Sequence, residues 1–249
     1  MRVTEVADRV VSVLDLLGAE PDGLGVREIA RRLDVHPSTA SRLLGTLSAS
    51  GLIEREGGGR YRLGARIVGL AAAAVDRLPV VSQARPELEH LSAVTSETVN
   101  LAIRDGLHVV YVDQVTPAQT VVMASWVGRR SPVHASSSGK VLLAFGDERA
   151  REVVGRRRLE ALTSRTVTDP DRLAEVLRRV RRQGYAASTG ELEDGLVTIA
   201  APVLVEGAAV AAISVSGPAY RLPTRDVPHL ARQVMDAAAA ASHRMAGRS

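Results

Sequence analysis

The sequence predicts an α+β protein with an N-terminal winged helix-turn-helix, and three observations support this fold class. Residues 26–64 have the pattern of two short amphipathic helices followed by a two-stranded hairpin. Helical and strand patterns mix through the rest of the chain without an internal repeat. The 249 residues, 45% of them hydrophobic, suffice for one small and one medium core, which indicates two domains.

Three helices are predicted at the start of the first domain. Apolar residues recur at helical spacing over residues 3–17, and Gly18 is typical of a helix end. The inward face of the second helix consists of Ile29, Ala30 and Leu33. Pro37 suits the first turn of the third helix, because the N–H that proline lacks has no partner there. The apolar stripe of this third helix consists of Ala40, Leu43, Leu44 and Leu47.

The opposite face of the third helix carries small hydroxyl side chains beside one arginine. Such a face suits insertion into a major groove, where bulk is excluded and an arginine can bond guanine O6 and N7. We therefore predict that Arg42 reads a base. The candidate DNA contacts on this helix are Ser38, Thr39, Ser41 and Arg42.

A basic hairpin follows this helix and predicts the wing. Residues Ile53, Arg55, Tyr61 and Leu63 alternate around the tip 57–59, three glycines that can take positive φ. Residues 36–66 hold five arginines against two glutamates, a net charge of +3. The predicted phosphate contacts of the wing are Arg55, Arg60 and Arg62.

An Ala-rich helix over residues 67–78, ended by Pro79, is predicted to link the two domains. The predicted division is therefore 1–65 for the DNA-binding domain, 66–79 for the linker helix and 80–249 for the second domain. The further predicted elements are a helix over 83–94, a hairpin of 98–103 with 107–115, a helix from Asp169-Pro170 to Gly184, a strand pair of 199–205 with 208–215, and a terminal helix over 226–245.

Composition excludes several classes of site. The chain has no cysteine, which rules out disulfides and thiolate metal sites, and its six histidines lack the spacing of metal ligands. We expect no metal and no cofactor. The chain shows no signal segment and no long apolar span, so we expect a cytoplasmic protein without a membrane partner. The net charge is only +4, and Lys140 is the sole lysine.

An enzymatic second domain is not supported by the motifs. Ser137 and Lys140 have the Ser-x-x-Lys spacing of a nucleophile and its base, but that chemistry also uses a Lys-Thr-Gly strand, which a chain with one lysine lacks. The same segment fails as a phosphate loop, because His134 stands where the first glycine belongs. We expect no catalytic residue. The arginine-rich run 149–182 is interleaved with glutamates, so we interpret it as salt-bridged, solvated helix faces.

The order of motifs along nearly the whole chain resembles the IclR family of bacterial transcription regulators. The motifs are VREIARRLDVHPSTASRLLGTL, GLIEREGGGRYRLG, VNLAIRDGLHVVYVDQV, VGRRSPVHASSSGKVLLA, RRQGYAASTGELEDGLVTIAAPV and AAISVSGPAYRL. The resemblance implies a winged-helix DNA-binding domain, a linker helix and a GAF-like domain that binds a small effector.

The resemblance also implies where the effector binds. Its contacts fall at the start of the helix after His134, on the strand that enters IAAPV, and on the two serines of ISVSG. These positions, with the preceding strand, are Ser137, Ser138, Ser188, Leu196, Thr198, Ser214 and Ser216. Some family members carry an acidic residue and a cysteine where this chain has Ser188 and Thr198, so their ligand chemistry does not carry over. Met123 and Trp126 are candidates for an apolar wall, and core packing is the alternative for both.

The sequence thus predicts a ligand-responsive regulator that binds double-stranded operator DNA. Because one helix-turn-helix contacts few base pairs, a homodimer is expected, and the sequence leaves open its pairing into a homotetramer. The predicted effector is a small polar molecule, and a carboxylate fits because N–H groups gather at a helix start. The alternative is a GAF-like metabolite-binding or catalytic protein whose winged helix mediates only protein contacts.

Overall fold

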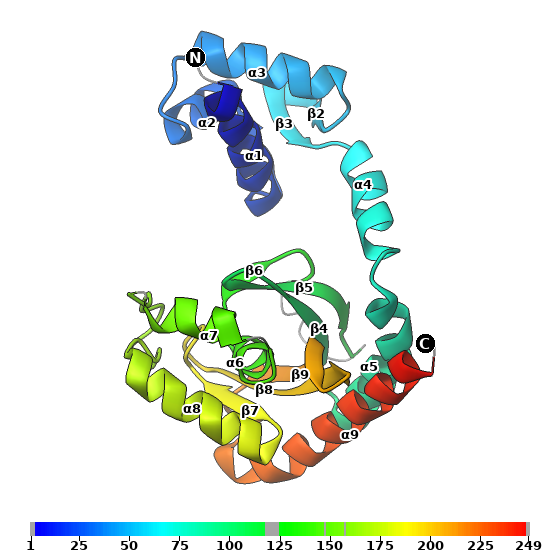
Figure 1. Ribbon diagram of the computed structural model, residues 1–249. Helices are drawn as coiled ribbons and strands as arrows, with labels where there is room; N and C mark the ends of the chain where they lie inside the picture. Colours follow the sequence, from blue (N-terminus) through cyan, green and yellow to red (C-terminus); the bar gives the residue numbers. More distant parts are fainter. Residues whose placement is uncertain (1–2, 118–124, 147, 157, 248–249) are drawn as a thin grey trace. The chain divides into compact units, whose positions relative to one another are not determined.

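The structure, a computed structural model, describes residues 3–117, 125–146, 148–156 and 158–247. The chain divides into two compact units, Met1–Arg77 and Leu78–Ser249 (Figure 1). Each unit has its own hydrophobic core, so each is described by itself.

The first unit is a winged helix-turn-helix, as predicted. Its helices are α1 (Val3–Ala19), α2 (Val26–Arg32), α3 (Pro37–Ala49) and α4 (Arg66–Val75). An antiparallel sheet of order β1-β3-β2 forms the wing from β1 (Leu24–Gly25), β2 (Ile53–Arg55) and β3 (Arg60–Leu63). The buried core between helices and wing includes Val13, Leu17, Ile29, Leu44, Leu47, Ile53 and Tyr61.

Local sequence signals explain the turns of this unit. Pro37 is the first residue of α3, and the His36 side chain caps the helix by accepting a hydrogen bond from the Ser38 N–H at 3.3 Å. At the wing tip, Gly58 and Gly59 have φ values of 82° and 77°, a region that L side chains rarely adopt. The predicted glycine tip of the wing is therefore confirmed.

Two predicted helix ends, at residues 18 and 78, and one predicted helix start, at residue 83, are wrong. Helix α1 runs through Gly18 to Ala19, because a turn closed by the Gly23 N–H on the Glu20 carbonyl follows it. Helix α4 ends at Val75, and Pro79 begins the next helix instead of ending the linker. Proline is tolerated in the first turn of a helix, so it marks a start as readily as an end.

The second unit is built on a six-stranded antiparallel sheet of order β6-β5-β4-β9-β8-β7. Its strands are β4 (Thr98–Asp105), β5 (His108–Val115), β6 (Arg130–Pro132), β7 (Ala186–Thr189), β8 (Leu196–Val205) and β9 (Ala208–Pro218). Its helices are α5 (Pro79–Thr95), α6 (Ser137–Ala144), α7 (Glu148–Gly155), α8 (Pro170–Gln183) and α9 (Val227–Ala246). Helices α5 and α9 cover one face of the sheet, here called the outer face; α6, against which α8 packs, covers the inner face (Figure 1).

The strands alternate their side chains between these two faces. Leu101, Ile199 and Ile213 lie in the outer core with α5 and α9, whereas Ala102 and Ala200 lie in the inner core with α6 and α8. The small residues of the inner face let α6 approach the sheet closely. This alternation also determines which polar side chains face α6.

Two classes of feature are absent from the described residues. No single helix among the described residues is long and apolar enough to cross a membrane. The helices α4 and α5 meet the length and composition criteria only when they are taken together, and they are bent relative to each other at the break between them. In the same part of the chain, no group of three or more His, Asp or Glu residues is placed to hold a metal ion.

Candidate functional site

The outward face of α3 carries the predicted recognition residues. Ser38, Ser41 and Arg42 are exposed and Thr39 is half-buried, while Ala40, Leu44 and Leu47 are buried on the other side of the helix. The Ser38 hydroxyl lies 2.8 Å from Nδ1 of His36. Within the described residues, the Arg42 guanidinium has no hydrogen bond and no ion pair. Arg42 is therefore available to an outside partner.

The three arginines of the wing differ in their partners. Arg60 donates from Nε to the Asp22 carbonyl at 2.9 Å and from Nη2 to the Gly23 carbonyl at 2.6 Å. Arg62 forms an ion pair with Glu56 at 2.8 Å. Arg55 is exposed, lies over the Tyr61 ring at 5.9 Å, and has no carboxylate partner in the described part of the chain. Arg60 braces the wing, whereas Arg55 keeps its hydrogen-bond donors free.

A row of hydroxyl side chains crosses four strands on the inner face of the sheet. Strand register pairs Thr98 with Ser216, Ser216 with Thr198, and Thr198 with Ser188. Asn100 and Ser214 pair with each other two residues along the same strands. We call these six residues the polar row: Thr98, Asn100, Ser188, Thr198, Ser214 and Ser216. Five of the six are at most 6% exposed, and Thr198 is half-buried.

The start of α6 lies against this row. Ser137 donates a hydrogen bond from Oγ to Oγ1 of Thr198 at 2.8 Å, and Ser138 is buried beside it. Ser136 caps the helix, because its Oγ accepts from the Gly139 N–H at 3.1 Å. A Cβ on Gly139 would lie 2.2 Å from the Val133 carbonyl oxygen, so only glycine fits there. The structure thus brings together the predicted residues Ser137, Thr198, Ser188, Ser214 and Ser216, with Leu196 on the same face of β8.

Two members of the polar row were not predicted from the sequence. Asn100 donates from Nδ2 to Ser216 Oγ at 3.2 Å, but its Oδ1 is buried without a hydrogen-bond partner, and so is Oγ1 of Thr98. Buried polar atoms nearly always have a partner, so these two atoms have hydrogen-bonding capacity that the described residues do not use. The available signal was the period of two that sets Thr98 and Asn100 apart from the apolar Val99 and Leu101.

Trp126, predicted to be an apolar wall, lies in the inner core. Its ring centroid is 5.3 Å from that of Tyr111 in an edge-to-face contact, and both side chains are buried. Burial raises the pKa of the Tyr111 hydroxyl above its ordinary value, so this hydroxyl stays neutral near pH 7. Met123 lies outside the described residues.

Lys140 forms a buried ion pair instead of serving Ser137 as a base. Its Nζ binds Oε1 of Glu191, and the side chains of the two residues are 1% and 12% exposed. Burial lowers the pKa of Lys140 below its ordinary value, and the Glu191 carboxylate partly opposes this shift. The Ser-x-x-Lys spacing therefore produces no pair of nucleophile and base, because Ser137 is bonded to Thr198 and Lys140 to Glu191.

Comparison with known proteins assigns the family. Residues 72–243 match the family of bacterial transcriptional regulator IclR C-terminal domains, and residues 6–57 match the IclR helix-turn-helix domain. The HTH-type transcriptional regulator BhcR of Paracoccus denitrificans is 38% identical over 244 residues, which cover 97% of this chain and 87% of that protein. The regulator KdgR of Escherichia coli is 32% identical over 216 residues, covering 86% and 82%.

Solved structures agree with this assignment. An IclR homolog from Microbacterium hydrocarbonoxydans, in complex with 4-hydroxybenzoate, superimposes with a TM-score of 0.83 at 30% identity and covers 96% of this chain and 98% of that one. IclR of Thermotoga maritima superimposes with a TM-score of 0.77 at 27% identity, covering 97% and 99%. The relatives are named as transcriptional regulators and not as enzymes, which confirms the expectation of a non-catalytic protein. The chain belongs to the IclR family of bacterial transcription regulators.

Proposed function

We propose that this chain is a sequence-specific DNA-binding regulator whose operator affinity depends on a small effector bound between the start of α6 and the polar row. The observation that carries the proposal is the pair of unpaired buried acceptors, Asn100 Oδ1 and Thr98 Oγ1, on the face that α6 covers. The same chain presents an exposed, unpaired Arg42 on a recognition helix. One unit thus has a feature that fits DNA, and the other a feature that fits a ligand.

The DNA contacts follow from the first unit. Arg42 reads a base, because it is a cation without a partner among the described residues, on the face of α3 where Ser38, Thr39 and Ser41 are small. Arg55 contacts phosphate from the wing. Arg60 and Arg62 support the wing through their internal partners and add positive charge to the surface. We propose the division 1–65, 66–79 and 80–249, with α4 as the linker.

The effector contacts follow from the second unit. Ser137, Ser138, Ser188, Leu196, Thr198, Ser214 and Ser216 surround the ligand, with Trp126 as an apolar wall. The two unpaired atoms face a ligand hydroxyl, because Asn100 Oδ1 accepts hydrogen bonds and the Thr98 hydroxyl both donates and accepts. The N-terminus of α6 favours negative charge. A small hydroxy acid satisfies both conditions, and 4-hydroxybenzoate, the ligand of the Microbacterium relative, has both groups.

A dimer is supported by the exposed surface of α4. This helix has no buried residue, and Val68 and Leu70 are 70% and 54% exposed. An apolar helix in this state is typical of one that packs on a partner copy. We propose a homodimer through α4.

The DNA assignment is tested by titrating the protein with operator and random duplexes at near-physiological salt. Arg42→Ala should lose about 1–3 kcal/mol on the operator and little on random DNA. Arg55→Ala should weaken binding to both duplexes alike. It should also reduce by about one the slope of the logarithm of the binding constant against the logarithm of the salt concentration. Equal loss on both duplexes for Arg42→Ala would contradict base reading, and failure of the wild type to bind any duplex would favour a winged helix used for protein contacts.

The effector assignment is tested by the same titration in the presence of a candidate effector. The first probe is 4-hydroxybenzoate, and the next are hydroxy acids from the pathway that the neighbouring genes encode. The effector should change operator affinity by about 1–3 kcal/mol, because it must bind the two DNA-binding states unequally. Ser214→Val keeps the strand propensity but leaves a ligand group unpaired, so it should remove the response and preserve DNA binding without ligand. A wild-type response in Ser214→Val would place the site elsewhere, and loss of ligand-free DNA binding would make Ser214 structural.

A further inference from the structure

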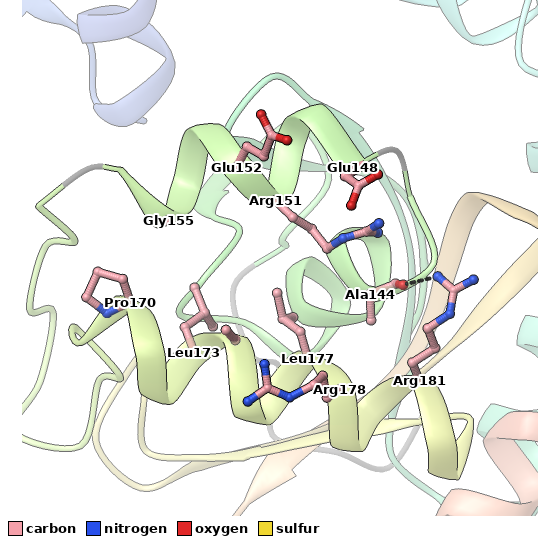
Figure 2. A pocket seen from close by; sticks show the side chains of 11 residues that line it. Ala144, Glu148, Arg151, Glu152, Gly155, Pro170, Leu173, Leu177, Arg178 and Arg181 are labelled. Carbon is pink, nitrogen blue, oxygen red and sulfur yellow. Dashed lines mark hydrogen bonds between the residues drawn. The ribbon is translucent and has the colours of Figure 1, made fainter.

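We propose a second small-molecule site, between α7 and α8, that binds an organic monoanion with an apolar body. A cavity of about 480 Å³ opens there, lined by both helices and by the last residue of α6 (Figure 2). Its volume lies in the range of ordinary ligand pockets, roughly 300–1,000 Å³. None of its described lining residues belongs to the polar row, and Ala144 lies at the opposite end of α6 from Ser137.

The floor of the cavity is apolar. Leu173 and Leu177 project from α8 toward Ala144, and all three are buried (Figure 2). Pro170 and Ala174 extend the same surface along α8. A hydrocarbon chain or a ring placed here removes its own apolar area and the exposed parts of Pro170 and Ala174 from water, which is the main source of affinity for such a ligand.

Three arginines line the mouth, and one of them has no partner. Arg178 is exposed and has no hydrogen bond and no ion pair within the described residues. Arg151 donates from Nη1 to the carbonyls of Leu143 and Gly146 at 3.1 and 2.8 Å, and Arg181 donates from Nη1 to the Ala144 carbonyl at 2.9 Å. These bonds hold both guanidinium groups beside the end of α6 and leave their other N–H groups available.

The balance of charge selects a monoanion. Glu148 and Glu152 of α7 also line the cavity, so its described charges are three arginines and two glutamates. In the described part of the arginine-rich run, the one ion pair is Arg156 with Glu152 at 3.9 Å, so the predicted salt-bridged face is not formed on α8. A ligand with several negative charges would meet the α7 carboxylates, whereas a single carboxylate can sit at Arg178 with its apolar body on the leucines.

The test uses sodium octanoate as the probe and octan-1-ol as its uncharged counterpart, with methyl-labelled full-length protein observed by NMR. Octanoate should shift the methyl signals of Leu173 and Leu177. Arg178→Gln should weaken octanoate about two- to five-fold, the range for an exposed ion pair, and leave octan-1-ol unchanged. Arg182→Gln is the matched control, because Arg182 is exposed on the same helix outside the cavity lining.

A second variant tests the cavity itself. Ala174→Trp should fill the floor and remove the octanoate shifts, while the other methyl signals of the second unit stay dispersed, which shows that this unit is folded. Ser214→Val should keep the octanoate shifts, so this site and the effector site can fail independently. The proposal is overturned by octanoate that leaves Leu173 and Leu177 unshifted at millimolar concentration, by equal affinities of Arg178→Gln and Arg182→Gln, or by unchanged binding to Ala174→Trp.

Discussion

Removing the positive charge of Lys140 should destabilise the second unit more than removing the whole ion pair. The Lys140 and Glu191 side chains are 1% and 12% exposed, and Glu191 Oε2 has no hydrogen-bond partner. Burial is the largest cause of the lowered Lys140 pKa, and it outweighs the attraction of Glu191. The pair as a whole therefore stabilises little, but Lys140→Met leaves Glu191 as an uncompensated buried carboxylate.

The magnitude follows from the exposure of the two partners. Breaking a buried pair by removing one partner costs about 3–5 kcal/mol, and the partial exposure of Glu191 places this case near 3 kcal/mol. For a unit of the size of Leu78–Ser249, this corresponds to a fall in melting temperature of about 6–12 °C. The double variant Lys140→Met/Glu191→Leu should recover most of the loss, because methionine and leucine fill the site without charge.

Thermal and urea unfolding of the wild type, both single variants and the double variant measure this cycle. A loss below about 1 kcal/mol in Lys140→Met, or a double variant no more stable than that single one, would refute the reasoning.

The pH dependence of the free energy of unfolding gives a further check. Because the native pKa of Lys140 lies below its ordinary 10.5, the unfolded chain binds more protons between these two values. The wild-type free energy of unfolding therefore gains a rising contribution with pH across that window, which Lys140→Met should lack.

Three other variants test the packing and assembly described above. Gly139→Ala should lower the free energy of unfolding by about 1–3 kcal/mol in urea titrations, because its Cβ would meet the Val133 backbone; Gly45→Ala, with open space around it, should not. Asp169→Ala removes the cap that accepts from the Arg172 N–H at 2.7 Å and should cost about 1 kcal/mol, whereas Asp169→Asn should retain most of it. Val68→Ser with Leu70→Ser should weaken self-association in light scattering, and a wild type that is monomeric at micromolar concentration would contradict the proposed dimer.

Local signals in the sequence predicted the fold well, because they act over a few residues. Helix α8 lies between Asp169 and Gly184, as expected. The Asp169 side chain accepts a hydrogen bond from an N–H of the first turn, and Gly184 adopts a φ of 84° after the last turn. The prediction that Pro79 ends the linker helix was wrong, because proline suits the start of a helix and also stops one. The element types were thus predictable, while the exact ends depended on packing.

Partners that are distant in sequence could not be predicted from local pattern. Arg60 reaches carbonyls 37 and 38 residues away, and Lys140 and Glu191 are 51 residues apart. Asn100 meets Ser216 across 116 residues, because β4 and β9 are neighbours in the sheet. The family resemblance supplied the serines of β9, but only the strand register revealed that the polar row extends to Thr98 and Asn100.

The hydrogen bond between Ser137 and Thr198 suggests how a ligand could be coupled to the position of α6. A ligand that donates to Asn100 Oδ1 gains about 0.5–1.5 kcal/mol net from this hydrogen bond, because its own donor gives up a bond to water. The same ligand, seated between α6 and the sheet, competes for the hydroxyls that now bond to each other at 2.8 Å. Because Gly139 already packs against the Val133 backbone, α6 has no room to move closer to it. If the proposed effector takes the place of Ser137 at Thr198, it breaks a contact between α6 and β8, and a difference of this kind between the free and bound states is what a switch requires.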